Sequence, residues 1–144
     1  MYETVTKMLQ THPKGTTDAL QPLARCIEAC FACAQTCMAC ADACLAEAGA
    51  GELLRCIRLN LDCADICEGT GRMLSRRQEA DVELLRQAVA LCRLSCRKCG
   101  EECRLHASLH EHCAFCEQAC RACEHACEHL LSAWSNDGST KKPS

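Results

Sequence analysis

The chain has 144 residues, a net charge of −3 and an estimated pI of 6.1, so it is long enough for one domain with a core of its own. Its charge balance excludes the basic surface that nucleic acid or an anionic membrane would need, and no apolar run approaches the roughly 20 residues of a membrane span. Eighteen residues are cysteines and only 3% are aromatic, so bulky rings do not build the core. The first ten residues lack the apolar region and the twin arginine of an export signal. We therefore expect a cytoplasmic protein, in which thiols stay reduced and dense cysteine indicates metal or redox chemistry.

One short and four long helices are predicted in chain order. Ala, Leu, Glu, Arg and Cys dominate the sequence and proline is nearly absent after position 22, a composition that favours helix over strand. The predicted helices cover about residues 2–11, 18–48, 52–73, 75–106 and 108–133. Short loops between the long helices predict an all-α fold, an antiparallel four-helix bundle with a short N-terminal helix. We expect three parts: the short N-terminal helix and linker at 1–17, the bundle at 18–134 and a disordered tail at 135–144.

Three of the long helices are predicted to begin at a capping box, a pattern in which a Ser or Asp is followed three residues later by Glu or Gln. The boxes are Asp18–Gln21, Ser75–Gln78 and Ser108–Glu111. A single helix through the third and fourth segments is the rival interpretation, because the cysteine spacing continues almost unbroken between them. Such a helix would leave its cysteines exposed, so we expect a turn near Ala107–Leu109. In the short N-terminal helix, Tyr2, Val5, Met8 and Leu9 lie on one side.

Cysteine recurs mainly in steps of three and four along the long helices, which keeps the side chains on one helix face. The cysteines are Cys26, Cys30, Cys33, Cys37, Cys40 and Cys44 in the first; Cys56, Cys63 and Cys67 in the second; Cys92, Cys96, Cys99 and Cys103 in the third; and Cys113, Cys116, Cys120, Cys123 and Cys127 in the fourth. One or two of them would be ordinary small core residues. Eighteen are not needed for packing, and parallel ladders offer no particular disulfide pairing. We therefore expect a core lined by free thiols.

Thiolates are soft ligands that select Cu(I), zinc or iron–sulfur clusters. Structural zinc sites and iron–sulfur clusters use compact sets of four ligands, whereas these ladders predict a continuous column. Cu(I) accepts two ligands, and CxxxC pairs such as Cys26/Cys30 and Cys123/Cys127 suit such a bridge. Pairs of thiolates around single ions would leave many buried negative charges, which cost several kcal/mol each. We therefore expect about one Cu(I) per cysteine, with each thiolate bridging two ions.

The open end of the column is predicted to lie where the first–second and third–fourth loops meet. Counting inward at about 1.5 Å per residue places His106 and His110 uppermost and Cys26, Cys30 and Cys127 deepest. The far end is apolar and forms a plug, so both histidines are predicted to be metal ligands at a mouth. Asn60 lies on the cysteine face and is either a weak oxygen ligand or a polar group near the mouth.

The remaining histidines do not follow the cysteine ladders. His125 and His129 are predicted to lie on the surface, because they face away from the neighbouring cysteines, and His12 and His112 remain unassigned.

With these ladders the chain resembles the bacterial copper storage proteins, and specifically their cytosolic, cysteine-richest type. The resemblance covers about residues 18–133 and rests on the cysteine spacing at 26–44, 63–67, 92–103 and 113–127. It implies a homotetramer of four-helix bundles, each filled with Cu(I) bound mainly by bridging cysteines. Exported members of this family carry a twin-arginine signal and methionines at the mouth, whereas this chain lacks the signal and has His106 and His110 there.

We therefore expect intracellular storage and sequestration of copper(I), with copper exchanged with copper chaperones or low-molecular-weight thiols. No enzyme activity is expected, because the sequence has no phosphate-binding loop, no nucleophile–base pair and no carboxylate pair on a cysteine face. The alternatives are a general buffer of thiophilic metals, chiefly zinc, and an iron–sulfur electron-transfer protein. We also expect the metal-free chain to be helical, because its helix signals do not involve metal.

Overall fold

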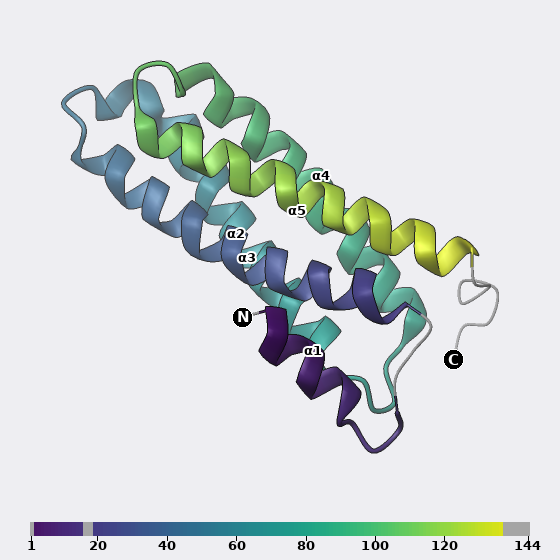
Figure 1. Cartoon of the computed structure of the whole chain (residues 1–144). Helices are drawn as coiled ribbons and strands as arrows, with labels where there is room; N and C mark the ends of the chain where they lie inside the picture. Colours follow the sequence, from purple (N-terminus) through teal and green to yellow (C-terminus); the bar gives the residue numbers. More distant parts are fainter. Residues whose placement is uncertain (1, 16–18, 137–144) are drawn as a thin grey trace.

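Four long helices run side by side in alternating directions, and a short helix packs against one end of them in the computed structural model, which describes residues 2–15 and 19–136 (Figure 1). The elements are α1 (Tyr2–Gln10), α2 (Leu20–Ala46), a 3-10 turn η1 (Ala50–Leu53), α3 (Leu54–Ser75), α4 (Val82–His106) and α5 (Glu111–Asn136). Each long helix packs against two others, in the order α2, α3, α4, α5 and back to α2. The predicted all-α four-helix bundle is confirmed, and no strand occurs in the described part of the chain.

The loop between α3 and α4 differs from its prediction. Ser75 ends α3, and its hydroxyl donates to the carbonyl of Gly71 at 2.7 Å instead of capping a new helix. The N-cap of α4 is Asp81, whose carboxylate accepts the N–H of Leu84 at 3.0 Å. The predicted box at residues 75–78 is therefore wrong, because a serine hydroxyl close to the preceding turn bonds backwards as readily as forwards.

The connection between α4 and α5 is the predicted turn at residues 107–109, so the rival single helix is excluded. Helix α5 begins at Glu111, and the carbonyl of His110 accepts the N–H of Ala114 at 3.3 Å. Ser108 is therefore inside the turn and does not cap α5, in contrast to its prediction.

Three other predicted bounds also shift. Asp18, the predicted cap of the first long helix, lies outside the described residues, and α2 begins at Leu20. Glu52, the predicted start of the next helix, lies in η1, and α3 begins two residues later. At the other end, α5 continues through Asn136, two residues into the predicted tail.

The end of the bundle that carries the α3–α4 loop is apolar, as predicted. Leu74, Val89 and Leu130 are fully buried there, below the last cysteines. Helix α1 covers part of α2 through the buried Leu9, whereas Met8 is 68% exposed and does not share that packed side. The bundle is therefore closed by side chains at this end.

Helix α2 is long and apolar enough to span a membrane by length and composition, which the sequence-based expectation overlooked. Its apolar character comes largely from cysteine and alanine. Because all six cysteines of α2 are buried inside the bundle, its length and composition are those of a core helix.

Candidate metal-binding core

All eighteen cysteines are at most 1% exposed and all are free thiols. Most sulfur atoms lie 3.5–4.0 Å from a sulfur of another residue, well beyond the roughly 2.05 Å of a disulfide. The regular steps of three and four place one row of thiols on the inner face of each helix. As expected, the four rows meet on the axis of the bundle.

The thiols form a column that continues from the apolar end to the opposite loops. Contacts between sulfur atoms of different helices run in this order: Cys26–Cys127 at 3.8 Å, Cys30–Cys92 at 3.8 Å, Cys67–Cys96 at 3.5 Å, Cys33–Cys120 at 3.8 Å, Cys37–Cys116 at 3.7 Å, Cys56–Cys103 at 3.9 Å and Cys44–Cys113 at 4.0 Å. Cys26, Cys30 and Cys127 lie at the deep end of this order, as predicted, because the rise of a helix is constant and the helices are antiparallel.

Neighbouring thiols in the column also form overlapping sets of four. The sulfur atoms of each set lie within 4.8 Å of one another: Cys30, Cys92, Cys123 and Cys127; Cys33, Cys63, Cys67 and Cys96; Cys33, Cys37, Cys63 and Cys120; and Cys37, Cys99, Cys116 and Cys120. Cys33, Cys37, Cys63 and Cys120 each belong to two of these sets. The column is therefore a continuous array of donor atoms rather than a row of separate four-ligand sites.

Asn60 is fully buried among thiols of the upper part of the column. Its Oδ1 accepts from Cys116 at 3.0 Å and from Cys99 at 3.1 Å, and its Nδ2 donates to Cys56 at 3.4 Å. Asn60 thus occupies the place of a thiol on the face of α3, as its position in the ladder indicates. The amide satisfies sulfur groups that would otherwise have no oxygen or nitrogen partner.

The histidine that touches the column is His112, which the sequence left unassigned. Its Nδ1 lies 3.4 Å from the sulfur of Cys40 and 3.7 Å from that of Cys113. Its Nε2 lies 2.8 Å from a carboxylate oxygen of Glu47. Because a carboxylate only accepts, Nε2 carries the proton and Nδ1 presents a lone pair to the thiols. With Cys44, these groups form a set of four possible ligands at the end of the column.

His106 and His110 lie at the predicted mouth but contact carboxylates. Nε2 of His106 is 3.0 Å from Glu102, and Nδ1 of His110 is 3.1 Å from Glu47. The rings of His110 and His112 stack with centroids 5.5 Å apart. All three histidines are half-buried, with 19–26% of the side chain exposed. The polar mouth therefore consists of three imidazoles held by two carboxylates, and His112 lies within 3.4 Å of a sulfur atom.

The surroundings at the mouth shift the pKa of two thiols and of one carboxyl group in opposite directions. Burial, followed by the repulsion of neighbouring thiolates, raises the pKa of both Cys44 and Cys113. The hydrogen bond from His112 lowers the pKa of Glu47, and the two nearby imidazoles add to this effect. Cys44 and Cys113 thus keep their protons beside an ionised carboxylate. At the same end, hydrogen bonds from Cys103 and Cys40 lower the pKa of Cys56 to about 3.

The sequence contained one signal for His112 that its periodicity hides. His112 precedes Cys113 directly, so a strict count of helical steps places it off the cysteine face. It lies in the first turn of α5, where Glu47 from the end of α2 holds the ring over Cys40. The sequence signal for its place at the mouth is the occurrence of His110 and His112 two residues apart at the start of a helix. His125 and His129 are exposed, as predicted.

Several known proteins are similar to this chain in sequence and in structure. The model of the copper storage protein family matches residues 19–132. The copper storage protein Ccsp of Streptomyces lividans, in a structure loaded with 10 copper equivalents, is 47% identical with a TM-score of 0.85, over 89% of this chain and 98% of that one. A five-copper structure of the cytosolic protein from the same organism is 49% identical with a TM-score of 0.77, over 78% and 93% of the two chains. An uncharacterized cysteine-rich protein of Bacillus subtilis, YhjQ, is 37% identical over 65% of this chain and 82% of its own length. The chain belongs to the copper storage protein family.

Proposed function

We propose that this protein stores and sequesters copper(I) in the cytoplasm, at about one ion per cysteine. The observation that carries the proposal is the continuous column of eighteen buried free thiols, in which neighbouring sulfur atoms lie within 4.8 Å of one another and many pairs within 4.0 Å. The copper in the structures of the Streptomyces protein supports copper as the cargo. The ion is held and released unchanged, so no catalytic turnover is part of this proposal.

The proposed ligands are the eighteen cysteines, with His106, His110, His112 and Asn60 near the mouth. Each thiolate bridges two Cu(I) ions, so that the positive charge of the ions offsets the negative charge of the sulfur atoms. Burying an uncompensated charge costs several kcal/mol, which favours filling the column to this limit. The Nδ1 lone pair of His112 and the two sulfur atoms next to it form the first ligand set that an entering ion meets. The carboxylate of Glu47 orients this imidazole from its other side, as is usual for histidine ligands.

Zinc storage is the weaker alternative, because the sets of four thiols overlap. A tetrahedral zinc ion needs four ligands of its own. Cys33 belongs to two sets, so a zinc ion bound in one of them would leave the other set with three thiols. The two sets that share Cys37 exclude each other in the same way. Zinc would therefore use fewer sites than the column offers, whereas two-coordinate Cu(I) uses every sulfur.

Anaerobic titration of the fully reduced, metal-free protein tests this function. With a competing Cu(I) chelator, we expect tight binding of about 18 Cu(I) per chain, one for each thiol. Saturation at about four to five ions, with tetrahedral zinc preferred, would support the zinc alternative. A coloured iron–sulfur chromophore in the purified protein would support electron transfer instead.

The mouth assignment has its own test. We expect the double variant His106→Ala, His110→Ala to take up Cu(I) more slowly at nearly unchanged capacity, because both side chains lie at the entrance rather than within the column. His112→Ala removes a donor that touches two thiols and should slow uptake further. Unchanged kinetics in both variants would overturn the entrance at this end.

We further propose that the protein is a homotetramer, and that it exchanges copper with copper chaperones or low-molecular-weight thiols at the mouth. Several large apolar side chains are exposed, which supports assembly through these surfaces. They include Leu45, Leu54, Leu61, Leu84, Leu91, Leu105, Leu109 and Phe115. Light scattering coupled to size exclusion should give four times the chain mass of 15.8 kDa. A mass of one chain would contradict the tetramer without affecting the storage proposal.

A further inference from the structure

Two histidines on the outside of α5 stand apart from the thiol column. Residues 123–129 read Cys-Glu-His-Ala-Cys-Glu-His, so the same order of side chains recurs after four residues. Cys123 and Cys127 point into the core, and His125 and His129 are both exposed. Residues four apart on a helix have their Cβ atoms about 5–6 Å from each other. The repeat therefore places the two histidines one turn apart on the exposed face of α5.

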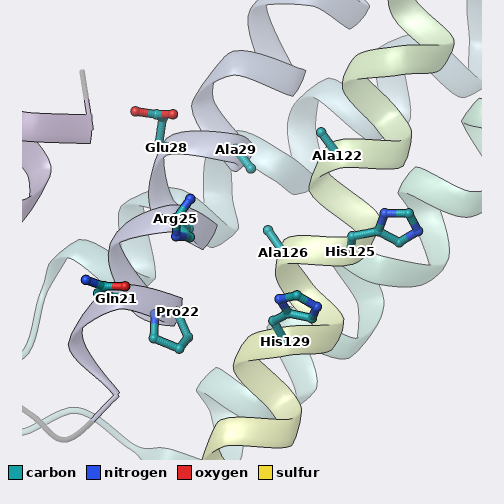
Figure 2. Close-up of a pocket in the computed structure, with 9 residues that line it drawn as sticks. All are labelled: Gln21, Pro22, Arg25, Glu28, Ala29, Ala122, His125, Ala126 and His129. Atoms are coloured by element: carbon teal, nitrogen blue, oxygen red, sulfur yellow. The ribbon is translucent and has the colours of Figure 1, made fainter.

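The imidazoles border a groove of about 460 Å³ between α2 and α5. Figure 2 shows them on successive turns of α5, with the small side chains of Ala122 and Ala126 beside them. On the α2 side, Ala29 is equally small. The alanines leave the rings uncovered, so a ligand can approach both of them from solvent.

Glu28 also lines the groove, and three other charged groups around this pair are engaged elsewhere. Glu124 pairs with Arg121 at 3.3 Å, and Glu128 pairs with Arg93 at 3.5 Å. Across the groove, the guanidinium of Arg25 lies 5.2 Å from the ring centroid of Tyr2.

Neither His125 nor His129 has a hydrogen bond or ion pair with any residue that the structure describes. Their nitrogen atoms are therefore available to an external ligand.

We propose that His125 and His129 form a chelate site for a divalent first-row transition metal ion, with Cu(II) bound most tightly. Two histidines at positions i and i+4 of a helix are the metal-binding unit of zinc proteases, so the spacing is suited to chelation. Imidazole is a ligand for Cu(II), Ni(II) and zinc, and affinity among divalent ions rises to Cu(II). Water completes the coordination of the bound ion.

This site differs from the column in chemistry and in place. The column offers only buried sulfur over most of its length, which suits Cu(I), whereas the groove offers two exposed nitrogen atoms. The groove lies beside the closed half of the bundle, near Cys26 and Cys127, far along α5 from the mouth histidines. Binding at the two places is therefore independent, and the outer site remains available when the column is full.

Electron paramagnetic resonance of protein filled with Cu(I) tests the site, because Cu(I) is silent and occupied thiolates no longer compete. One equivalent of Cu(II) should give a signal with hyperfine coupling to two nitrogen atoms. Competition with glycine should show that His125→Gln and His129→Gln each weaken Cu(II) binding by about 100-fold, the low end of what linking two ligands contributes. Glutamine is a good helix former and both positions are exposed, so folding is preserved.

The matched control is the double variant His106→Gln, His110→Gln, which should keep the same Cu(II) affinity and signal. Retention on a resin charged with redox-inert Ni(II) gives a second measurement, and only the two α5 variants should elute early. An unchanged Cu(II) affinity in both α5 variants, or its loss in the mouth variant alone, would overturn the proposal.

Discussion

Replacing Asn60 by alanine tests how a polar group contributes to a core of thiols. Asn60 is fully buried, and in the metal-free protein its amide accepts two short hydrogen bonds, from Cys116 at 3.0 Å and Cys99 at 3.1 Å. Each is expected to contribute about 1 kcal/mol net, and the space left by the amide adds about 1 kcal/mol. We therefore expect Asn60→Ala to lower the free energy of unfolding by about 2–3 kcal/mol, which corresponds to a melting temperature lower by about 6–9 °C.

The assay is thermal unfolding of the reduced, metal-free protein, followed by circular dichroism under nitrogen. Thr70→Ala is a matched control, because Thr70 is also buried in α3 but its hydroxyl donates a single long hydrogen bond within the described residues, to the carbonyl of Ala88 at 3.5 Å. This control should lose about 1 kcal/mol or less. Equal melting temperatures for Asn60→Ala and the native chain would refute the reasoning that the amide stabilises the thiols.

The same variant separates two roles of Asn60 in the loaded protein. Thiolates that bind copper have lost the protons they donate to Oδ1, so those hydrogen bonds no longer exist after loading. If Oδ1 is a copper ligand, the capacity of Asn60→Ala falls by about one ion. If the amide only accepts thiol protons, capacity stays the same and the stability difference between variant and native chain shrinks on loading. Both quantities come from one Cu(I) titration followed by a melting curve.

Three other changes have expected outcomes. Above pH 9 the melting temperature of the metal-free protein should fall, because burial raises the pKa of Cys44 and Cys113. The unfolded chain loses these two protons from about pH 9, whereas the folded chain keeps them. The free energy of unfolding should therefore decrease by about 1.4 kcal/mol per thiol and pH unit. Gly69→Ala should stabilise the protein by about 1 kcal/mol, because nothing lies within 4 Å of the added Cβ. Gly71→Val should destabilise it by about 1–3 kcal/mol, because the added Cβ would lie 3.0 Å from the ring of Phe31. Chemical denaturation measures both changes. Glu47→Gln should slow Cu(I) uptake severalfold in stopped-flow measurements without changing capacity, because it removes the negative charge that holds His112.

The interior of the bundle was predictable because helical geometry is regular. A cysteine every three or four residues leaves one direction for all thiols of a helix, and the constant rise then determines which layers meet. Cys26 and Cys127 contact each other at the deep end of the column, where the count places them. Asn60 was placed correctly for the same reason, although only coordinates reveal that its oxygen faces thiols from two other helices.

The ends of the helices were less predictable, because several local patterns compete there. Ser75 and Ser108 both fit a capping box, yet the first bonds back to its own helix and the second lies in a turn. The contact of His112 with Cys40 depends on where α5 begins. His112 lies in the first turn of α5, so its ring reaches Cys40 although the residue does not follow the spacing of three and four that the cysteines keep. The hydrogen bond between Glu47 and the ring of His112 joins residues 65 positions apart, and no local sequence pattern indicates it.

The proposed storage function requires that the core change little when it fills, and the protons of the thiols explain how this is achieved. Empty, the column is close to neutral because most of its thiols carry protons that neighbouring sulfur atoms or Asn60 accept. If each entering Cu(I) displaces one proton, a monovalent ion replaces a monovalent ion and the buried charge stays near zero at every stage. Uptake without proton loss would instead place up to eighteen positive charges in the core, at several kcal/mol each.

The number of protons released is therefore diagnostic of the thiol column. In weakly buffered solution with a pH indicator, we expect about one proton per Cu(I) through most of the titration, since ligating thiols must be deprotonated. Zinc in a four-thiolate site would release up to about four protons per ion and leave a net negative site. A value well below one proton per Cu(I) would mean that the thiols are already ionised in the empty protein, and the neutral exchange of protons for copper would have to be abandoned.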